Sequence, residues 1–238
     1  SEIKGLATLA GEWPKINENH LLRNLVNGYR SLYKTRETFF EEVRELPSGN
    51  CLKINSSNKI STHKYWNFLP KEKKNLSYPE ALEITREAVI NAVRLRMRSD
   101  VPVAFCMSGG VDSNSLISVA SKVLGFDVHG FTIASKDERY EEQDLVDKSV
   151  KELGIKHTSI NLDQENFLDN LRYVIKAHDS PIYTISYYIQ WQLMQAMASK
   201  GYKVTISGTG ADELFTGYYD HHNLYLYEIF QNKKLYKK

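Results

Sequence analysis

The hexapeptide SGGVDS at residues 108–113 constrains the fold of this chain more than any other segment. It follows the apolar run VPVAFCM at residues 101–107, which is typical of a buried strand. Apolar residues then recur at helical spacing until Gly125. A strand that passes through paired glycines into a helix brings unpaired backbone N–H groups to the positive end of the helix dipole. The segment therefore predicts an anion-binding loop.

Polar side chains in this loop narrow the kind of anion. Ser108 and Ser113 add hydroxyl donors, whereas the carboxylate of Asp112 would repel a phosphate unless a divalent cation lies between them. The loop lacks the lysine of the GxxxxGK[ST] motif, so it suits a released pyrophosphate better than γ-phosphoryl transfer. A tight turn before a capped helix is the simpler interpretation. The order of strand, paired glycines, Asp and Ser favours a magnesium-pyrophosphate site.

Strands and helices alternate over the C-terminal two-thirds of the chain. A helix opens with a capping box and an early proline at residues 77–80. Beyond it we expect strands at residues 101–107, 127–133, 156–160 and 203–206, and helices at residues 113–124, 141–153, 165–177 and 184–199. This order predicts an α/β fold with a doubly wound parallel sheet covered on both faces. Ligands bind such sheets beyond the carboxyl ends of the strands, where strand order reverses.

Residues 1–70 show a different pattern of expected elements from the rest of the chain. A short helix is expected at residues 20–29, followed by short strands at 39–46, 50–55 and 59–66. This small N-terminal β-meander and helix segment is too slight to be a stable domain alone. With a charged linker at residues 69–75, the sequence predicts two parts, residues 1–70 and residues 71–238.

A second glycine-rich turn follows the last expected strand. Residues 207–213, SGTGADE, repeat the passage from strand to turn and again deliver a carboxylate. Asp112 and Asp212 could therefore share one Mg²⁺ with bound phosphates. A loop with a helix-capping aspartate is the simpler interpretation, and the first motif favours the metal site.

Composition excludes several classes of protein. The net charge of +2 argues neither for nor against nucleic acid, but the sequence shows no long basic run and no concentrated basic face, so we expect no nucleic-acid partner. We find no stretch of membrane-spanning length and no signal peptide, so we expect no membrane association. Cys51 and Cys106 lack CxxC spacing, which indicates free thiols in a reducing compartment and a cytoplasmic protein.

The two motifs together resemble the synthetase half of the asparagine synthetase family, glutamine-dependent amidotransferases with a PP-loop adenylating domain. Residues 108–113 match the signature SGGxDS, and residues 207–218 match SGxGxDExFxGY. Residues 178–181, HDSP, resemble the D-x-P step that precedes the second signature. Residues 1–4 and 44–49 resemble the close of the glutaminase half and its junction. The likeness covers essentially the whole chain.

The resemblance implies a fold, two ligands and a site. The fold would be Rossmann-like, of the PP-loop adenine nucleotide alpha hydrolase type, with ATP and Mg²⁺ as ligands. The backbone around adenine and ribose would be that of Met107, Ile133, Ser207 and Gly208. Pyrophosphate would be held by Ser108, Gly109, Gly110, Asp112 and Ser113, and Mg²⁺ by Asp112 and Asp212.

The resemblance also implies a reaction in two steps. A substrate carboxylate attacks the α-phosphorus of ATP, giving an acyl-adenylate and pyrophosphate, and ammonia then displaces AMP to form an amide. Thr209 is the candidate catalytic position, because asparagine synthetases carry Glu there, near the acyl-adenylate and the ammonia. Threonine is no carboxylate base at neutral pH, so either the acceptor is not aspartate, for example a sugar carboxylate, or the base lies elsewhere.

The pattern predicts a fragment of an asparagine synthase-like ligase that lacks full turnover. The N-terminal cysteine of the family's glutaminase and its lysine downstream of the second signature have no counterpart here. Ammonia would come from glutamine through a glutaminase domain outside this sequence, and a homodimer is left open. Two alternatives remain. One is another PP-loop adenylating enzyme, such as a GMP or NAD synthetase or a tRNA thiolase, and the other is an inactive nucleotide-binding module.

Overall fold

The chain folds into two compact units. One is formed by the described residues of 1–76 and 164–189, and the other by those of 77–163 and 190–238. The expected linker at residues 69–75 lies outside the described residues, and the domain boundary at residue 70 stays a prediction. The computed structural model describes residues 2–67, 76–134, 142–163 and 165–232.

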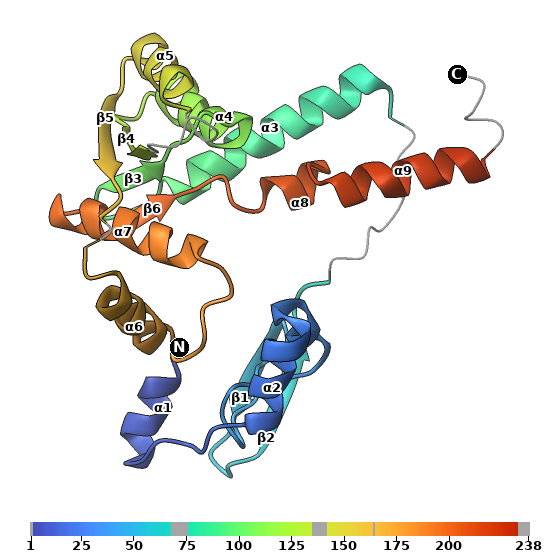
Figure 1. Ribbon diagram of the computed structural model, residues 1–238. Helices are drawn as coiled ribbons and strands as arrows, with labels where there is room; N and C mark the ends of the chain where they lie inside the picture. Colours follow the sequence, from blue (N-terminus) through green and yellow to red (C-terminus); the bar gives the residue numbers. More distant parts are fainter. Residues whose placement is uncertain (1, 68–75, 135–141, 164, 233–238) are drawn as a thin grey trace. The chain divides into compact units, whose positions relative to one another are not determined.

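The second unit is built on a parallel sheet of four strands in the order β5-β4-β3-β6 (Figure 1). Since β6 pairs with β3 on the side opposite to β4, strand order reverses between β3 and β6. The expected α/β doubly wound parallel sheet is confirmed. The strands are β3 (Val103–Cys106), β4 (His129–Ala134), β5 (Lys156–Asn161) and β6 (Val204–Ile206).

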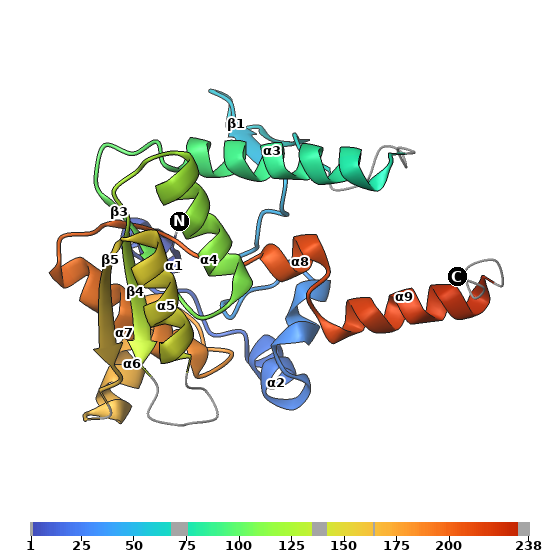
Figure 2. The same ribbon diagram turned by 90° about the horizontal axis from the view of Figure 1, so that it is seen from above.

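Helices α3, α4 and α5 cover one face of this sheet. Phe105 of β3 and Met107, directly after β3, pack with Ile117 of α4, Val93 of α3 and Val146 of α5, and all five side chains are buried. Figure 2 shows α4 and α5 lying over the strands in the view from above. Because successive side chains of a strand point to opposite faces of the sheet, every second side chain of the short apolar run enters this core. The helices are α3 (Tyr78–Arg96), α4 (Val111–Ser118) and α5 (Gln143–Leu153).

Helix α7 (Ser186–Ser199) covers the other face with its C-terminal part, residues 190–199. Ala104 of β3 and Phe131 of β4, both fully buried, pack there with Leu193 and Met197. The intervening residues of the strands therefore form a second core. Burial on both faces is what a parallel sheet requires, and it explains the continuous apolar sequence of β3.

Local signals fix the ends of several helices in this unit. The Glu80 carboxylate accepts hydrogen bonds from the Ser77 hydroxyl (2.6 Å) and backbone N–H (2.8 Å) at the start of α3, and these bonds lower the pKa of Glu80. After α4 the chain continues as a π-helical turn, Val119–Val123, and Gly125 follows at φ +72°. Two helices beyond β6, α8 (Ala211–Phe215) and α9 (Tyr219–Gln231), were not expected from the sequence.

The first unit contains helices and one small hairpin. The helix expected at residues 20–29 is present but begins two residues earlier. The strands β1 and β2 pair antiparallel, from Asn50↔Lys64 to Ile54↔Ile60. The elements are α1 (Ile3–Ala10), α2 (Glu18–Asn27), a 3₁₀ helix (Tyr29–Lys34), β1 (Asn50–Ile54), β2 (Ile60–Lys64) and α6 (Phe167–His178).

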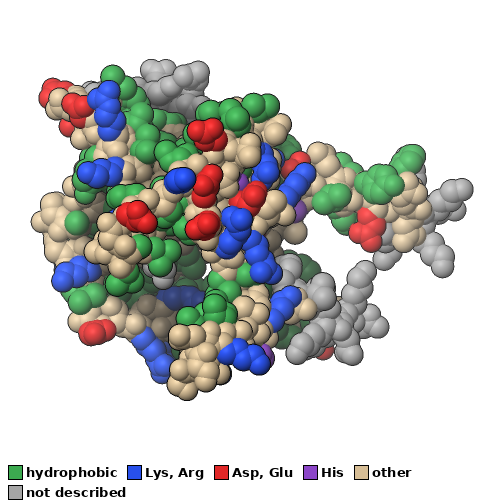
Figure 3. All heavy atoms as spheres, turned by 90° about the horizontal axis from the view of Figure 1, so that it is seen from below, with side chains coloured by type: hydrophobic (Ala, Val, Ile, Leu, Met, Phe, Trp, Pro, Cys, Tyr) green, Lys and Arg blue, Asp and Glu red, His purple; other side chains and the backbone are tan. Residues whose placement is uncertain are grey.

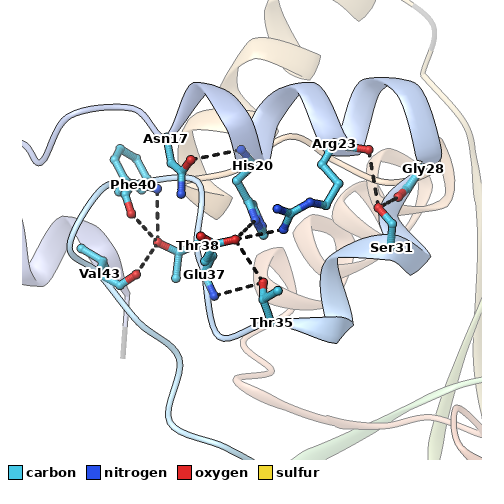
Figure 4. Close-up of polar contacts among 10 residues, drawn as sticks. All are labelled: Asn17, His20, Arg23, Gly28, Ser31, Thr35, Glu37, Thr38, Phe40 and Val43. Carbon is cyan, nitrogen blue, oxygen red and sulfur yellow. Dashed lines mark hydrogen bonds and ion pairs between the residues drawn. The ribbon is translucent and has the colours of Figure 1, made fainter.

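The prediction of a strand at residues 39–46 is wrong. The segment makes only isolated bridges, between Ile16 and Phe40 and between Glu37 and Arg44, and Glu42 turns the chain at φ +64°. The hydroxyl of Thr38 lies 3.1 Å from the carbonyl oxygens of both Phe40 and Val43 (Figure 4). These local bonds take the place of hydrogen bonds to a neighbouring strand, so the apolar residues of this segment belong to a turn.

A polar cluster next to this turn ties it to α2 (Figure 4). Asn17 caps the helix by accepting the His20 N–H at 3.0 Å, and Arg23 forms a 2.9 Å ion pair with Glu37. The hydrogen bond from Arg23 lowers the pKa of Glu37. His20 is 2% exposed and packs edge-on against the ring of Phe39. Burial therefore lowers the pKa of His20, because the cation loses its hydration.

We predict that stability falls as the solution becomes mildly acidic. Burial lowers the pKa of His20, His129 and His157, so the unfolded chain, with histidine pKa values of about 6.5, binds protons first. The midpoint of urea unfolding should therefore fall between pH 7.5 and pH 5.5. The carboxylates of Glu37 and Glu80, whose pKa values are lowered, stay ionised over this range.

The matched variant is His129→Leu, which removes one of these proton-binding sites. Its urea midpoint should change less between the two pH values than that of the wild-type chain. An equal change in both proteins, or a midpoint that rises toward pH 5.5, would contradict the assignment.

Candidate active site

Two glycine-rich loops leave the sheet where strand order reverses. β3 ends at Cys106 and is followed by residues 107–110, and β6 ends at Ile206 and is followed by residues 207–210. Because β3 and β6 are parallel neighbours, both loops lie at the same edge. This is the position at which open α/β sheets bind ligands, and it is where the sequence predicted the site.

Gly208 brings the two loops into contact. A Cβ atom at this position would lie 3.0 Å from Cβ of Asp112 and 3.1 Å from the backbone nitrogen of Ser113. Only the absence of a side chain lets the second loop pack this closely on the first turn of α4. The expected meeting of the two motifs is thus present in the structure.

The first loop is held by its own side chains. The Oγ atoms of Ser108 and Ser113 lie 3.0 Å apart, and Ser113 also accepts the Ser108 N–H at 3.2 Å. The Asn114 amide donates to the carbonyl oxygens of Ser108 (2.9 Å) and Gly110 (2.8 Å). Gly110 occupies the N-cap of α4 and has no side chain with which to cap it. The first-turn N–H groups are therefore available to an anion.

Gly217 makes room for the carboxylate of Asp212. A Cβ atom at Gly217 would collide with Oδ1 of Asp212, and the Gly217 N–H donates to the Asp212 carbonyl oxygen at 3.0 Å. Asp212 lies in the first turn of α8, as Asp112 lies in the first turn of α4. Each aspartate thus follows a strand and a glycine-rich loop, and neighbouring glycines leave space around both.

The two aspartates fit a magnesium ion that also binds phosphate. Asp112 and Asp212 line one pocket, and the described residues contain no group of three or more His, Cys, Asp or Glu side chains that could hold a metal alone. Mg²⁺ commonly binds proteins through one or two carboxylates, with phosphates and water completing its octahedron. The donor set therefore suits a metal that arrives with a nucleotide.

The pocket between the loops has a volume of about 540 Å³, enough for a small molecule. Gly109 alone among the expected site residues is not part of its lining. The expected residues that line it are Met107, Ser108, Gly110, Asp112, Ser113, Ile133, Ser207, Gly208, Thr209 and Asp212.

Several lining residues were not found from the sequence. Thr132 lies near the end of β4 and Glu142 at the N-cap of α5, so their closeness to the end of a strand and to the start of a helix could have indicated them. Gln190 and Met194, four residues apart on α7, could be placed only once the packing of that helix was known. The residues missed are Cys106, Thr132, Ala134, Glu142, Gln143, Gln190, Leu193, Met194 and Thr205.

Glu142 contacts the anion loop directly. Its carboxylate accepts the backbone N–H of Gly109 at 2.7 Å. A Cβ atom at Gly109 would lie 3.0 Å from Cβ of Glu142, so this close approach also depends on a glycine. A carboxylate thus occupies one donor of the loop that was expected to hold pyrophosphate.

Thr209 lines the pocket with a neutral hydroxyl. Its Oγ1 accepts a hydrogen bond from Ser207 Oγ at 3.1 Å. The neighbouring carboxylate of Glu213 is exposed, does not line the pocket and accepts a hydrogen bond from the Tyr218 hydroxyl at 3.0 Å. The second loop therefore presents Thr209, and not a carboxylate, at this point of the wall.

Cys106 lines the pocket as a thiol. Burial raises its pKa, and a weak contact with the Thr205 hydroxyl at 3.6 Å offsets this only in part. The thiol is therefore protonated at neutral pH and is a poor nucleophile. Cys51 and Cys106 are both free, as expected.

The surface and the helices give two further observations. On the face drawn in Figure 3, Lys and Arg side chains are interspersed with Asp and Glu side chains. In the part of the chain that the structure describes, no helix is both long and apolar enough to cross a membrane. The absence of a nucleic-acid partner and the cytoplasmic location stay predictions.

Similar proteins agree with the motifs. Asparagine synthetase (glutamine-hydrolyzing) 1 of Bacillus subtilis (strain 168) is 29% identical over 76% of this chain and 28% of its own length. Putative asparagine synthetase (glutamine-hydrolyzing) 2 of Methanocaldococcus jannaschii is 28% identical over 94% of this chain and 43% of its own length. Amidase chry2 of Gibberella zeae is 27% identical over 76% of this chain and 30% of its own length.

The chain thus spans less than half the length of these relatives. The family model described as asparagine synthase matches residues 85–235, which is more than half of the chain and includes both glycine-rich loops. The match also includes the pocket between them. The family expected from the two motifs is confirmed: the chain belongs to the asparagine synthase family.

Proposed function

We propose that this chain carries the ATP-binding part of a ligase that adenylates a carboxylate and prepares it for amidation. The observation that carries the proposal is the contact of two glycine-rich loops at the strand reversal, with Asp112 and Asp212 lining one pocket. Backbone donors, hydroxyls and paired carboxylates are the groups that bind a nucleotide polyphosphate with its metal. The family names of the relatives support the same class of reaction.

The first step proposed is transfer of an adenylyl group. A carboxylate oxygen of the acceptor forms a bond to the α-phosphorus of ATP, and the bond from that phosphorus to the oxygen bridging to the β-phosphorus breaks. The products are an acyl-adenylate and pyrophosphate, which leaves with the electron pair. The protein contributes in-line positioning and stabilisation of the charge on the leaving group.

The groups of the first loop suit the leaving pyrophosphate. The N–H groups at the start of α4 are donors to its oxygens, and the Ser108–Ser113 pair has one further hydroxyl proton to donate, because the other is used in the hydrogen bond between the two serines. Asp112 and Asp212 would hold Mg²⁺, which would supply positive charge near the leaving group. Holding the two serines by a shared hydrogen bond pre-organises the loop, so little entropy is lost on binding.

The second step proposed is attack of ammonia on the acyl carbon. A C–N bond forms, the C–O bond to AMP breaks, and the nitrogen loses a proton to a base. Thr209 cannot take that proton as a carboxylate would, because its hydroxyl is neutral at pH 7. We therefore propose an acceptor carboxylate other than aspartate, with the base supplied by the acceptor or by another residue.

The remaining expectations are part of the same proposal. Residues 1–70 would be the junction with a glutaminase half, and residues 71–238 the PP-loop synthetase part. Ammonia would come from glutamine through that half, which is outside this sequence. Association of two copies and a cytoplasmic location are compatible with the proposal but do not carry it.

We predict that Asp112→Asn and Asp212→Asn each weaken the binding of ATP in the presence of Mg²⁺ by at least about tenfold, because each variant removes a charged ligand of the metal. Isothermal titration calorimetry with ATP checks this. In EDTA the affinity for ATP should not fall, because repulsion between a carboxylate and the phosphates is removed.

The control is Asp144→Asn. Asp144 is also an aspartate in the first turn of a helix that follows a strand, but it is exposed and does not line the pocket. Its variant should bind ATP like the wild-type chain. Unchanged Mg²⁺-dependent binding in both Asp112→Asn and Asp212→Asn would refute the metal site, and absence of ATP binding by the wild-type chain would refute the proposal as a whole.

A second prediction concerns the contact between the loops. Gly208→Ala should weaken ATP binding by about tenfold or more, because the added methyl group meets Asp112 and the Ser113 backbone at about 3 Å and pushes the loops apart. Gly5→Ala is the control, since a Cβ atom there meets nothing within 4 Å. Equal ATP affinity of both variants would show that the close approach has no role in binding.

A third prediction concerns the acceptor. With ATP, Mg²⁺ and ammonium, aspartate should give no asparagine above a reaction without the protein, because Thr209 has no carboxylate to take the proton that the nitrogen loses in the second step. A panel of sugar acids and other small carboxylates should contain the one that is converted to its amide. Robust formation of asparagine by the chain would overturn the inference drawn from Thr209.

A further inference from the structure

A chain of hydrogen bonds runs from β5 to the wall of the pocket. Nε2 of His157 lies 3.0 Å from Oγ1 of Thr132, and Oγ1 of Thr132 donates to the carbonyl oxygen of Met107 at 2.9 Å. Thr132 is 6% exposed, and both Thr132 and Met107 line the pocket, whereas His157 does not. The three residues therefore connect β5 through β4 to the end of β3.

The direction of these bonds follows from the number of protons. A carbonyl oxygen only accepts, so the single hydroxyl proton of Thr132 is used on Met107. Oγ1 of Thr132 can then only accept from His157, which requires a proton on Nε2. The neutral imidazole is thereby fixed as one tautomer, with Nδ1 unprotonated.

Gly130 leaves the space in which these groups converge. It pairs with His157 in the parallel register of β4 and β5. A Cβ atom at Gly130 would lie 3.0 Å from Sδ of Met107 and 3.7 Å from Cδ2 of His157. The side chains of Met107 and His157 thus approach each other over a glycine on the same face of the sheet.

We propose that His157 is a positioning residue for nucleotide binding: through the Thr132 hydroxyl it holds the Met107 carbonyl at the wall of the pocket. This inference rests on the proposed function, since it takes the ligand of the pocket to be ATP. A buried hydroxyl that loses its donor can rotate away from the carbonyl, and the wall then loses its fixed arrangement. His157 acts on the ligand only through this chain.

His129 provides a matched control within the same strand pair. Its Nε2 lies 2.8 Å from Oγ1 of Thr158, so it also joins β4 to β5 by an imidazole–threonine bond. Neither His129 nor Thr158 lines the pocket, and Nδ1 of His129 lies 3.0 Å from the Tyr202 hydroxyl. Removing His129 therefore breaks a similar imidazole–threonine bond, together with the bond to Tyr202, at the other end of the strand and away from the ligand.

The test compares ATP affinity with stability in the 238-residue chain, by calorimetry with ATP and Mg²⁺ and by urea unfolding. His157→Leu should weaken ATP binding by about fivefold, the ratio expected for one lost hydrogen bond. His157→Gln keeps an N–H donor at a similar reach and should restore most of the affinity. His129→Leu should lower the urea midpoint and leave ATP affinity within about twofold, because its two lost hydrogen bonds are far from the ligand and their cost to stability is independent of binding.

Two further measurements separate positioning from folding. Thr132→Val should weaken ATP binding as His157→Leu does, and the double variant should be no weaker than Thr132→Val alone, because both changes break one chain. If His157→Leu does not fold, Thr132→Val and His157→Gln still give the comparison. Long-range ¹H–¹⁵N spectra should report His157 protonated on Nε2, with Nδ1 unprotonated, in the wild-type chain.

The outcomes distinguish this inference from the proposed function. If the wild-type chain binds ATP and His157→Leu or Thr132→Val binds it equally well, the positioning role is wrong and the proposed function stands. If His157 is protonated on Nδ1 alone, the direction of the bonds is wrong and the inference falls with it. If the wild-type chain binds no ATP, both the proposed function and the inference are overturned.

Discussion

The pairing of β6 with β3 is the interaction on which the site depends. β3, β4 and β5 follow one another across the sheet, and β6 then adds on the opposite side of β3. This reversal places two loops that are a hundred residues apart in sequence at one edge of the sheet. With β6 beyond β5 instead, Asp112 and Asp212 would lie at strands far apart, and neither carboxylate could complete a site with the other.

The elements that the sequence predicted correctly are those with a strong local cause. The apolar run before residue 108 has no alternation, which suits burial on both faces, and Gly125 and Gly154 end the following helical patterns with positive φ values. The prediction of a strand at residues 39–46 was wrong because the apolar residues of this segment belong to a turn. The hydroxyl of Thr38 lies within hydrogen-bond distance of carbonyl oxygens that a neighbouring strand would otherwise bind. Helix α9 has many exposed apolar residues, which obscured its pattern.

The residues of the candidate site likewise divide into those with a local signal in the sequence and those without one. Its serines, glycines and aspartates follow strands directly, so chain order alone brought them together as candidates. Gln190 and Met194 reach the pocket from a helix whose orientation is set by packing of Leu193 and Met197 on the sheet. His157 could not be identified from the sequence for a different reason. It does not line the pocket, and its link to Met107 passes through the hydroxyl of a buried threonine.

The carboxylate of Glu142 already accepts the Gly109 N–H, so an anion can bind this donor only by replacing that carboxylate. A ligand that takes this N–H must first replace a carboxylate already seated on it, so its net gain is the difference between two charge-assisted bonds. A weak monovalent anion offers little more than the carboxylate it displaces, whereas a polyphosphate reaches several donors at once. Under the proposed function, the loop would therefore discriminate by the number of contacts that an anion makes at once, and small, singly charged anions would gain little by displacing Glu142.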